Sequence, residues 1–143
     1  MKFAKIMALW LALSGSAFAA GLDASDAGDY VQLDKDQKPT QMQMRYYLRG
    51  TQWVMDGKFG DGEWMPVCQG TGECRLQTSP ARKVREWKAM LPAELRAMPM
   101  ACIHNKAFAF CRMNKPDNPN MRLYWWFAWK DGQTYVFGLN RLR

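Results

Sequence analysis

The segment MPMACIH is the one place where the sequence gathers side chains that could hold a metal ion. On an extended strand every second side chain points to the same side, and every second residue here is a potential ligand: Met98, Met100, Cys102 and His104. Two thioethers, a thiolate and an imidazole would suit Cu(I). Pro99 interrupts strand pairing, however, and a disulfide is the better use of Cys102. Core methionines beside a structural disulfide are therefore the favoured interpretation, with a Cu(I) site at Met98, Met100 and His104 as an alternative.

Other catalytic patterns are not found in the sequence. His104 is the only histidine, and no G-x-S-x-G, H-E-x-x-H or P-loop pattern occurs. A glycosidase would need two carboxylates placed across a cleft, and the spacing of the glutamates indicates no such pair. Asp61 and Glu63 lie at an expected turn, where acidic residues have an ordinary structural role. We expect a protein that is not an enzyme and that needs no cofactor.

Residues 1–19 have the composition of a cleavable signal peptide. Lys2 and Lys5 precede an apolar run from Ile6 to Leu13, which is too short to span a bilayer as a helix. Small residues near the end of the segment predict cleavage after Ala19. No later apolar segment is long enough to anchor the chain in a membrane. We therefore expect a periplasmic or secreted protein that is not membrane-anchored.

Four cysteines follow the predicted cleavage point, and an even number in an exported chain indicates two disulfides. Three pairings are possible. Pairing Cys68 with Cys74 and Cys102 with Cys111 is favoured because each pair brackets a likely turn. On the chain-entropy model, each such short crosslink contributes roughly 2 to 3 kcal/mol to stability.

Charge divides the expected mature chain into two parts. Residues 20–40 are acidic, polar and without strong periodicity, which predicts a flexible N-terminal arm. Residues 41–143 carry 16 basic and 8 acidic side chains, a net charge of +8. A basic body attracts anionic partners, which in a bacterial envelope means acidic proteins, phosphorylated glycans or lipid headgroups. Nucleic acid is not an expected partner, because the chain is exported and shows no recognised nucleic-acid-binding signature.

The order of elements predicts an α+β fold in residues 41–143, as one small domain. Short strands begin with the alternating segment QMQMRYYLR, and strands return after residue 99. Between them, an apolar stripe through Val84, Trp87 and Leu91 predicts a helix with Ser79 as its N-cap. Pro92 predicts a kink, or two short helices that meet near Leu91. We expect an antiparallel sheet, which could curl toward a barrel, with this helix packed on it and with two hairpin disulfides.

The terminal segment YWWFAWKDGQTYVF predicts a hairpin with a two-residue turn at Asp131-Gly132. Its side chains alternate between two faces. One face has Trp125, Phe127 and Trp129 without any charge, and we assign it to the core. The other face combines aromatic rings with cations, which is typical of binding hot spots: Arg122, Tyr124, Trp126, Lys130, Tyr135, Phe137 and Arg141.

This second face carries the functional prediction. We expect a periplasmic binding protein of the inhibitor, immunity or envelope-accessory type, which uses the face to recognise another protein, most simply an acidic one. An envelope polysaccharide stacked on the same rings is the first alternative, and the Cu(I) site is the second. The sequence leaves open whether the face is exposed or is covered, either by the helix or by curling of the sheet.

Overall fold

The computed structural model describes residues 21–143, so the predicted signal peptide lies outside the described residues. These residues form one nine-stranded antiparallel sheet in the order β4-β3-β2-β1-β9-β8-β7-β6-β5. The first five strands are β1 (Gly28–Leu33), β2 (Pro39–Arg49), β3 (Gln52–Phe59), β4 (Met65–Cys68) and β5 (Gln77–Thr78). The other four are β6 (Met100–His104), β7 (Phe108–Lys115), β8 (Asn118–Lys130) and β9 (Gln133–Arg141).

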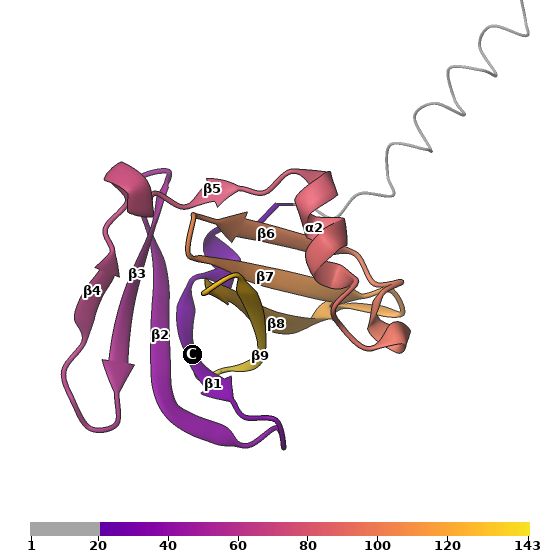
Figure 1. The fold of residues 1–143 in the computed structure, drawn as a ribbon, viewed down its shortest axis with the longest axis horizontal. Coiled ribbons are helices and arrows are strands. Elements are labelled where there is room, and N and C mark those ends of the chain that lie inside the picture. The colour runs from indigo at the N-terminus through magenta and orange to yellow at the C-terminus, as the bar shows by residue number, and fades with distance from the viewer. Residues whose placement is uncertain (1–20) are drawn as a thin grey trace, which may run out of the picture.

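The sheet curls into a half-barrel, in agreement with the expectation that it could curl toward a barrel. In Figure 1, β2, β3 and β4 stand upright on the left, and β6 and β7 run roughly horizontally on the right. Strands β1, β9 and β8 connect the two groups in the sheet order. The inner face encloses an aromatic core in which the ring of Phe110 stacks on Tyr46 and Tyr124, with centroid distances of 4.0 and 5.7 Å. Tyr30 closes this cluster edge-on against Phe110.

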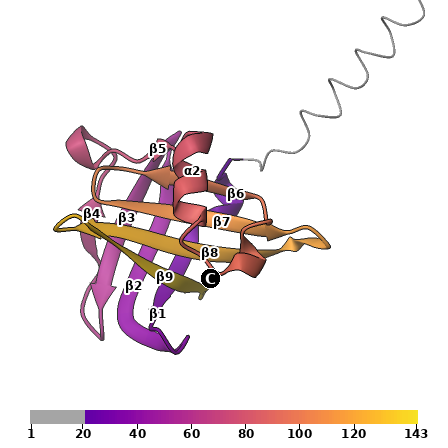
Figure 2. The ribbon, with the colours of Figure 1, turned by 45° about the vertical axis from the view of Figure 1, so that its right-hand side comes forward.

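A second core lies on the outer face, under the helix α2 (Ala81–Lys88). Both views of the ribbon place α2 across β6 and β7 (Figures 1 and 2). Val84 and Trp87 are its buried residues, and they pack over Phe127 of β8 and the Cys102–Cys111 disulfide. Since one sheet face is covered by the helix and the other by its own curl, each strand in the middle of the sheet has apolar side chains on both faces.

The helical region consists of two short helices, which is one of the two forms predicted near Leu91, whereas the predicted cap is wrong. The helix ends at Lys88, and the short 3-10 helix η4 (Ala93–Leu95) begins directly after Pro92, which cannot donate a helical hydrogen bond. Pro80 occupies the N-cap position and Ser79 lies outside the helix. The Ser79 hydroxyl pairs instead with Nδ1 of His104, at 2.7 Å.

The prediction of a flexible arm over residues 20–40 is wrong for the residues that the structure describes. Residues 24–26 form the 3-10 helix η2 (Ala24–Asp26), and β1 lies in the middle of the sheet between β2 and β9. Tyr30 is fully buried. The acidic residues that resembled a solvated tail include Asp26 and Asp29, which are both buried and paired with arginines far away in the sequence.

The other predictions about architecture are confirmed. The structure contains both predicted disulfides, Cys68–Cys74 and Cys102–Cys111, in a single small domain with a curled antiparallel sheet and one helix on it. Two disulfides point to an oxidising, extracellular compartment. Within residues 21–143, none of the helices has the length and apolar character that crossing a bilayer requires.

Candidate functional site

The predicted register of the terminal hairpin is confirmed by the pairing of β8 with β9. Trp126 faces Phe137, and Lys130 faces Gln133 across the turn. Asp131 and Gly132 both have positive φ angles, of 54° and 75°, as a type I′ turn requires. The face with Trp125, Phe127 and Trp129 meets the helix side of the sheet, in agreement with its assignment to the core. The predicted partner face is therefore the inner face of the half-barrel.

One end of the predicted partner face is occupied by the chain's own N-terminal segment, residues 23–27. Arg122 Nη1 lies 2.8 Å from Asp26 Oδ1, and the Tyr124 hydroxyl donates to the same oxygen at 2.8 Å. Arg141 donates from Nη1 to the backbone carbonyl of Ser25, at 2.8 Å, and from Nη2 to that of Ala27, at 2.7 Å. These three predicted binding residues thus serve as anchors within the molecule.

The middle of the predicted face is half-covered. The ring of Trp126 lies 5.7 Å from Phe108 and 5.8 Å from Phe137, at the margin of the inner core. Deeper in that core, burial raises the pKa of Tyr30 and of Tyr46 well above the usual value for a phenol, so both stay neutral. Trp126 and Phe137 are both partly buried, so only part of each side chain is available to a partner.

The other end of the predicted face is open. Strand β1 pairs with β9 only at residues 139–141, so in the described part of the chain the first half of β9 has no partner from β1. Tyr135 lies in this half and is 43% exposed, and Lys130 is exposed at the turn. The predicted face is therefore covered by residues 23–27 at its Arg122 end and exposed at its Tyr135 end.

A second exposed surface, which the sequence analysis did not identify, lies on the β3–β4 hairpin. Phe59, Met65 and Val67 are 70%, 67% and 45% exposed. Met65 pairs directly opposite Gly57, and Val67 Cγ2 would lie only 3.0 Å from a side chain built at that glycine. The three side chains therefore surround Gly57 on one side of the hairpin, and we refer to them as the β3–β4 patch.

The β3–β4 patch continues the inner core outward. Met42 pairs with Phe59 in the β2–β3 ladder, and its Cε would lie 3.5 Å from a side chain at Gly57. Met42 itself packs against the inner aromatic cluster. Both exposed surfaces, Tyr135 on β9 and the β3–β4 patch, thus belong to the inner face of the curled sheet, at places where the curl leaves it uncovered.

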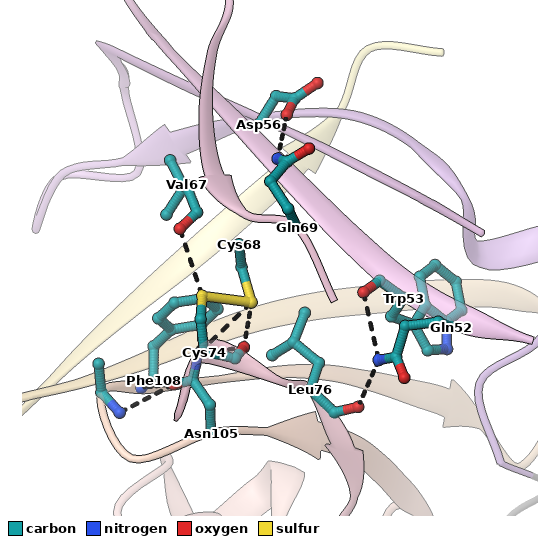
Figure 3. The surroundings of a disulfide bond; sticks show 11 residues. Gln52, Trp53, Asp56, Val67, Cys68, Gln69, Cys74, Leu76, Asn105 and Phe108 are labelled. Carbon is teal, nitrogen blue, oxygen red and sulfur yellow. Dashed lines mark hydrogen bonds between the residues drawn. A yellow bond between two sulfur atoms is a disulfide. The ribbon is translucent and has the colours of Figure 1, made fainter. Parts of the chain in front are cut away.

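A disulfide fixes the strand that carries this patch. Figure 3 shows Cys68, the last residue of β4, bonded to Cys74 of the 3-10 helix η3 (Gly72–Cys74). Asn105, in the turn between β6 and β7, donates to the carbonyl of Cys74 at 3.1 Å and accepts from the backbone N–H of Phe108 at 2.9 Å. The end of β4 is thereby tied to the opposite side of the half-barrel, which makes the exposed edge rigid.

The residues of the Cu(I) alternative lie in or beside the outer core. Cys102 is bonded to Cys111, which removes the thiolate from the ligand set. Met98 and Met100 pack in the outer core beneath α2. His104 lies at the end of β6, where burial and the positive charge of Lys83 lower its pKa. In the part of the chain that the structure describes, no cluster of three His, Cys, Asp or Glu side chains could hold a metal ion.

The β3–β4 patch could have been suspected from the sequence. Its three apolar residues flank a Gly-Asp-Gly turn segment, an unusual place for large exposed side chains. Their exposure depends on β4 being a sheet edge, however, and strand order is not readable from this local pattern.

Comparison with known proteins gives no relative from which a role could be transferred: no family model, no curated protein and no solved structure matches the chain.

Proposed function

We propose that this chain is an exported periplasmic binding protein that recognises another protein, as an inhibitor, immunity factor or accessory subunit in the envelope. The signal-peptide-like composition of residues 1–19 and the two disulfides support export into an oxidising compartment. The partner contacts the uncovered parts of the inner face, which are the β3–β4 patch and Tyr135 with Lys130.

The single observation that carries the proposal is the exposure of Phe59, Met65 and Val67 together on one edge hairpin. Large apolar side chains that lie together on a protein surface often mark a protein-protein contact, whereas single exposed apolar residues are common on any protein. Rigid support adds to the argument, because a surface that is already ordered loses little conformational entropy on binding. The disulfide at the end of β4 provides that support.

The expected partner is acidic. The acidic segment is part of the folded body, so the charge that a partner meets is that of residues 21–143 as a whole, with 18 basic and 13 acidic side chains and a net charge of +5. On the opposite face of β2 and β3 from the patch, Lys58 and Arg45 lie over the ring of Trp64, with distances of 5.5 and 4.1 Å to its centroid. A positive surface accelerates encounter with a negatively charged protein.

The test compares capture of envelope proteins by the native mature chain and by the double variant Phe59→Ser, Met65→Ser. Truncation of hot-spot residues costs about 2 kcal/mol or more, which corresponds to a loss of capture of about 30-fold. The matched control is Met90→Ser, which replaces a methionine that is 50% exposed just beyond α2. Since all three residues are exposed, the free energy of unfolding should change by no more than about 0.5 kcal/mol.

Equal capture by the double variant and the native chain would exclude the β3–β4 patch as the contact. Pre-treatment of the extract with protease separates protein from glycan: the proposal predicts that the captured material disappears, whereas its persistence would indicate a polysaccharide partner.

A further inference from the structure

Two adjoining hollows lie on the outside of the half-barrel, at the end of β6. Their volumes are about 460 and 260 Å³, and both are bordered by Lys83, His104, Asn105 and Lys106. They open between α2, the turn that joins β6 to β7, and the segment after η3. The larger volume lies within the usual range for small-molecule sites.

Positive charge converges on these hollows from separate elements. Lys83 comes from α2, Lys106 from the β6–β7 turn and Arg75 from the segment after η3. Lys106 has one ion pair, with Glu73 at 3.8 Å, and both side chains are more than 80% exposed, so the pair is weak. Among residues 21–143, no carboxylate forms an ion pair with Lys83 or Arg75.

The pKa of His104 is affected by this positive charge. Its pKa is lowered first by burial and then by the charge of Lys83. The ring is therefore neutral near pH 7, and its Nδ1 is held by the Ser79 hydroxyl at 2.7 Å. An imidazole fixed in this way is a stable part of the wall.

An indole and a carboxylate complete the smaller hollow. Trp129 borders it and is half-exposed, and the buried Trp87, whose ring lies at a centroid distance of 5.4 Å, borders the same hollow. Glu86 borders the same hollow. A carboxylate would repel a bare anion, but it can accept hydrogen bonds from hydroxyl groups. The wall thus combines cations, a flat apolar ring and a hydroxyl acceptor.

We propose that the two hollows form one binding site for an acidic saccharide. The acid group lies between Lys83 and Lys106, the sugar ring stacks on Trp129, and a ring hydroxyl donates to Glu86. A simple anion would make no use of the indole and would be repelled by Glu86, and an acidic peptide would stack on the indole only through an aromatic or proline residue. This site is distinct from the inner-face surface that contacts the protein partner.

The test is an NMR titration of the ¹⁵N-labelled mature chain with two sugars that differ in one group. N-acetylmuramic acid carries a lactyl carboxylate that N-acetylglucosamine lacks. We expect the acidic sugar to shift the indole N–H signal of Trp129 and to bind at least 10-fold more tightly than the neutral one. Lys83→Gln should weaken its binding about 10-fold, while Arg82→Gln, a matched charge removal on the same helix, should leave it unchanged.

Three outcomes would overturn the proposal. Equal affinity for both sugars would show that no cation takes part, and equal weakening by Lys83→Gln and Arg82→Gln would reduce the effect to net charge. Lactate or inorganic phosphate binding as tightly as the acidic sugar would reduce the site to one for anions alone. Because Lys83 has no ion pair and only repels a proton on His104, Lys83→Gln leaves the fold intact.

Discussion

Asp26 anchors the N-terminal segment of the described residues to the half-barrel through ion pairs. Its carboxylate is fully buried and lies 2.6 Å from Arg112 Nη1, whose side chain is only 3% exposed, and 2.8 Å from Arg122 Nη1. The Tyr124 hydroxyl and the backbone N–H of Asp23 donate to the same carboxylate. A buried charge held by several charge-assisted hydrogen bonds specifies one position for this segment.

Asp26→Ala is therefore expected to destabilise the fold by about 3 to 5 kcal/mol, the usual cost of breaking a buried ion pair from one side. Urea unfolding measures this change. Asp23→Ala is the control, since that side chain is exposed and only caps η2, so its loss should cost about 1 kcal/mol. A cost for Asp26→Ala no larger than that of the control would contradict the anchoring role.

His104 gives a second expectation, on the pH dependence of stability. Its folded-state pKa lies below the ordinary value of 6.5, so the unfolded chain binds the extra proton first. The contribution of His104 to stability is thus full above pH 6.5 and is lost as the pH falls from 6.5 through its folded pKa. His104→Gln should reduce the pH dependence of the unfolding free energy in that window.

Lys83→Gln should raise the pKa of His104 in the folded protein, as measured by NMR, because the positive charge of Lys83 lowers it. An unchanged pKa would contradict the proximity of Lys83 and His104.

At the scale of elements, features that depend on local sequence signals could be predicted, such as the β8–β9 register and the helix break. The register of β8 with β9 follows from one turn dipeptide, and the break between α2 and η4 follows from one proline. The position of β1 does not, because Asp26 and Asp29 find Arg112 and Arg45 at separations of 86 and 16 residues. Without those partners in view, the same acidic residues indicate a solvated tail.

The candidate site was less predictable for the same reason. The alternation of β8 correctly grouped Tyr124, Trp126 and Lys130 on one face. Whether each is anchored, half-covered or exposed depends on where residues 23–27 dock and where β1 ends along β9. These are long-range packing facts, which a hydrophobic pattern does not encode.

The edge element β4 provides a prediction at this scale. Replacing Cys68 and Cys74 together by alanine should release η3 and the end of β4, since the crosslink ties them to each other. We expect faster amide hydrogen exchange in residues 65–78 and an unchanged rate in β7 and β8, which keep the Cys102–Cys111 crosslink beside them. Faster exchange spread evenly over all strands would contradict a local role for this disulfide.

At the scale of the whole molecule, the two proposed surfaces lie on opposite faces of one sheet. The protein-binding surface belongs to the inner face, at the β3–β4 patch and Tyr135, and the acidic saccharide site lies outside, beside α2. A chain that binds a glycan on one face and a protein on the other could hold that protein at the envelope matrix.

Tyr135→Ala separates the two surfaces. The side chain is 43% exposed on the inner face, so its loss should weaken protein capture by about 10-fold. Saccharide affinity, measured by the same NMR titration, should not change. A parallel loss of both activities would instead show that the two surfaces are coupled or that the variant has disturbed the hairpin.

Site-specific photo-crosslinking in cells that produce the protein tests most directly whether the β3–β4 patch contacts a protein partner. A photoreactive phenylalanine analogue is placed at Met65, in the β3–β4 patch, or at Met90, an exposed methionine just beyond α2. If the β3–β4 patch contacts a protein, we expect a discrete protein adduct from position 65 and none from position 90. No adduct at position 65, or the same adduct at both positions, would contradict it.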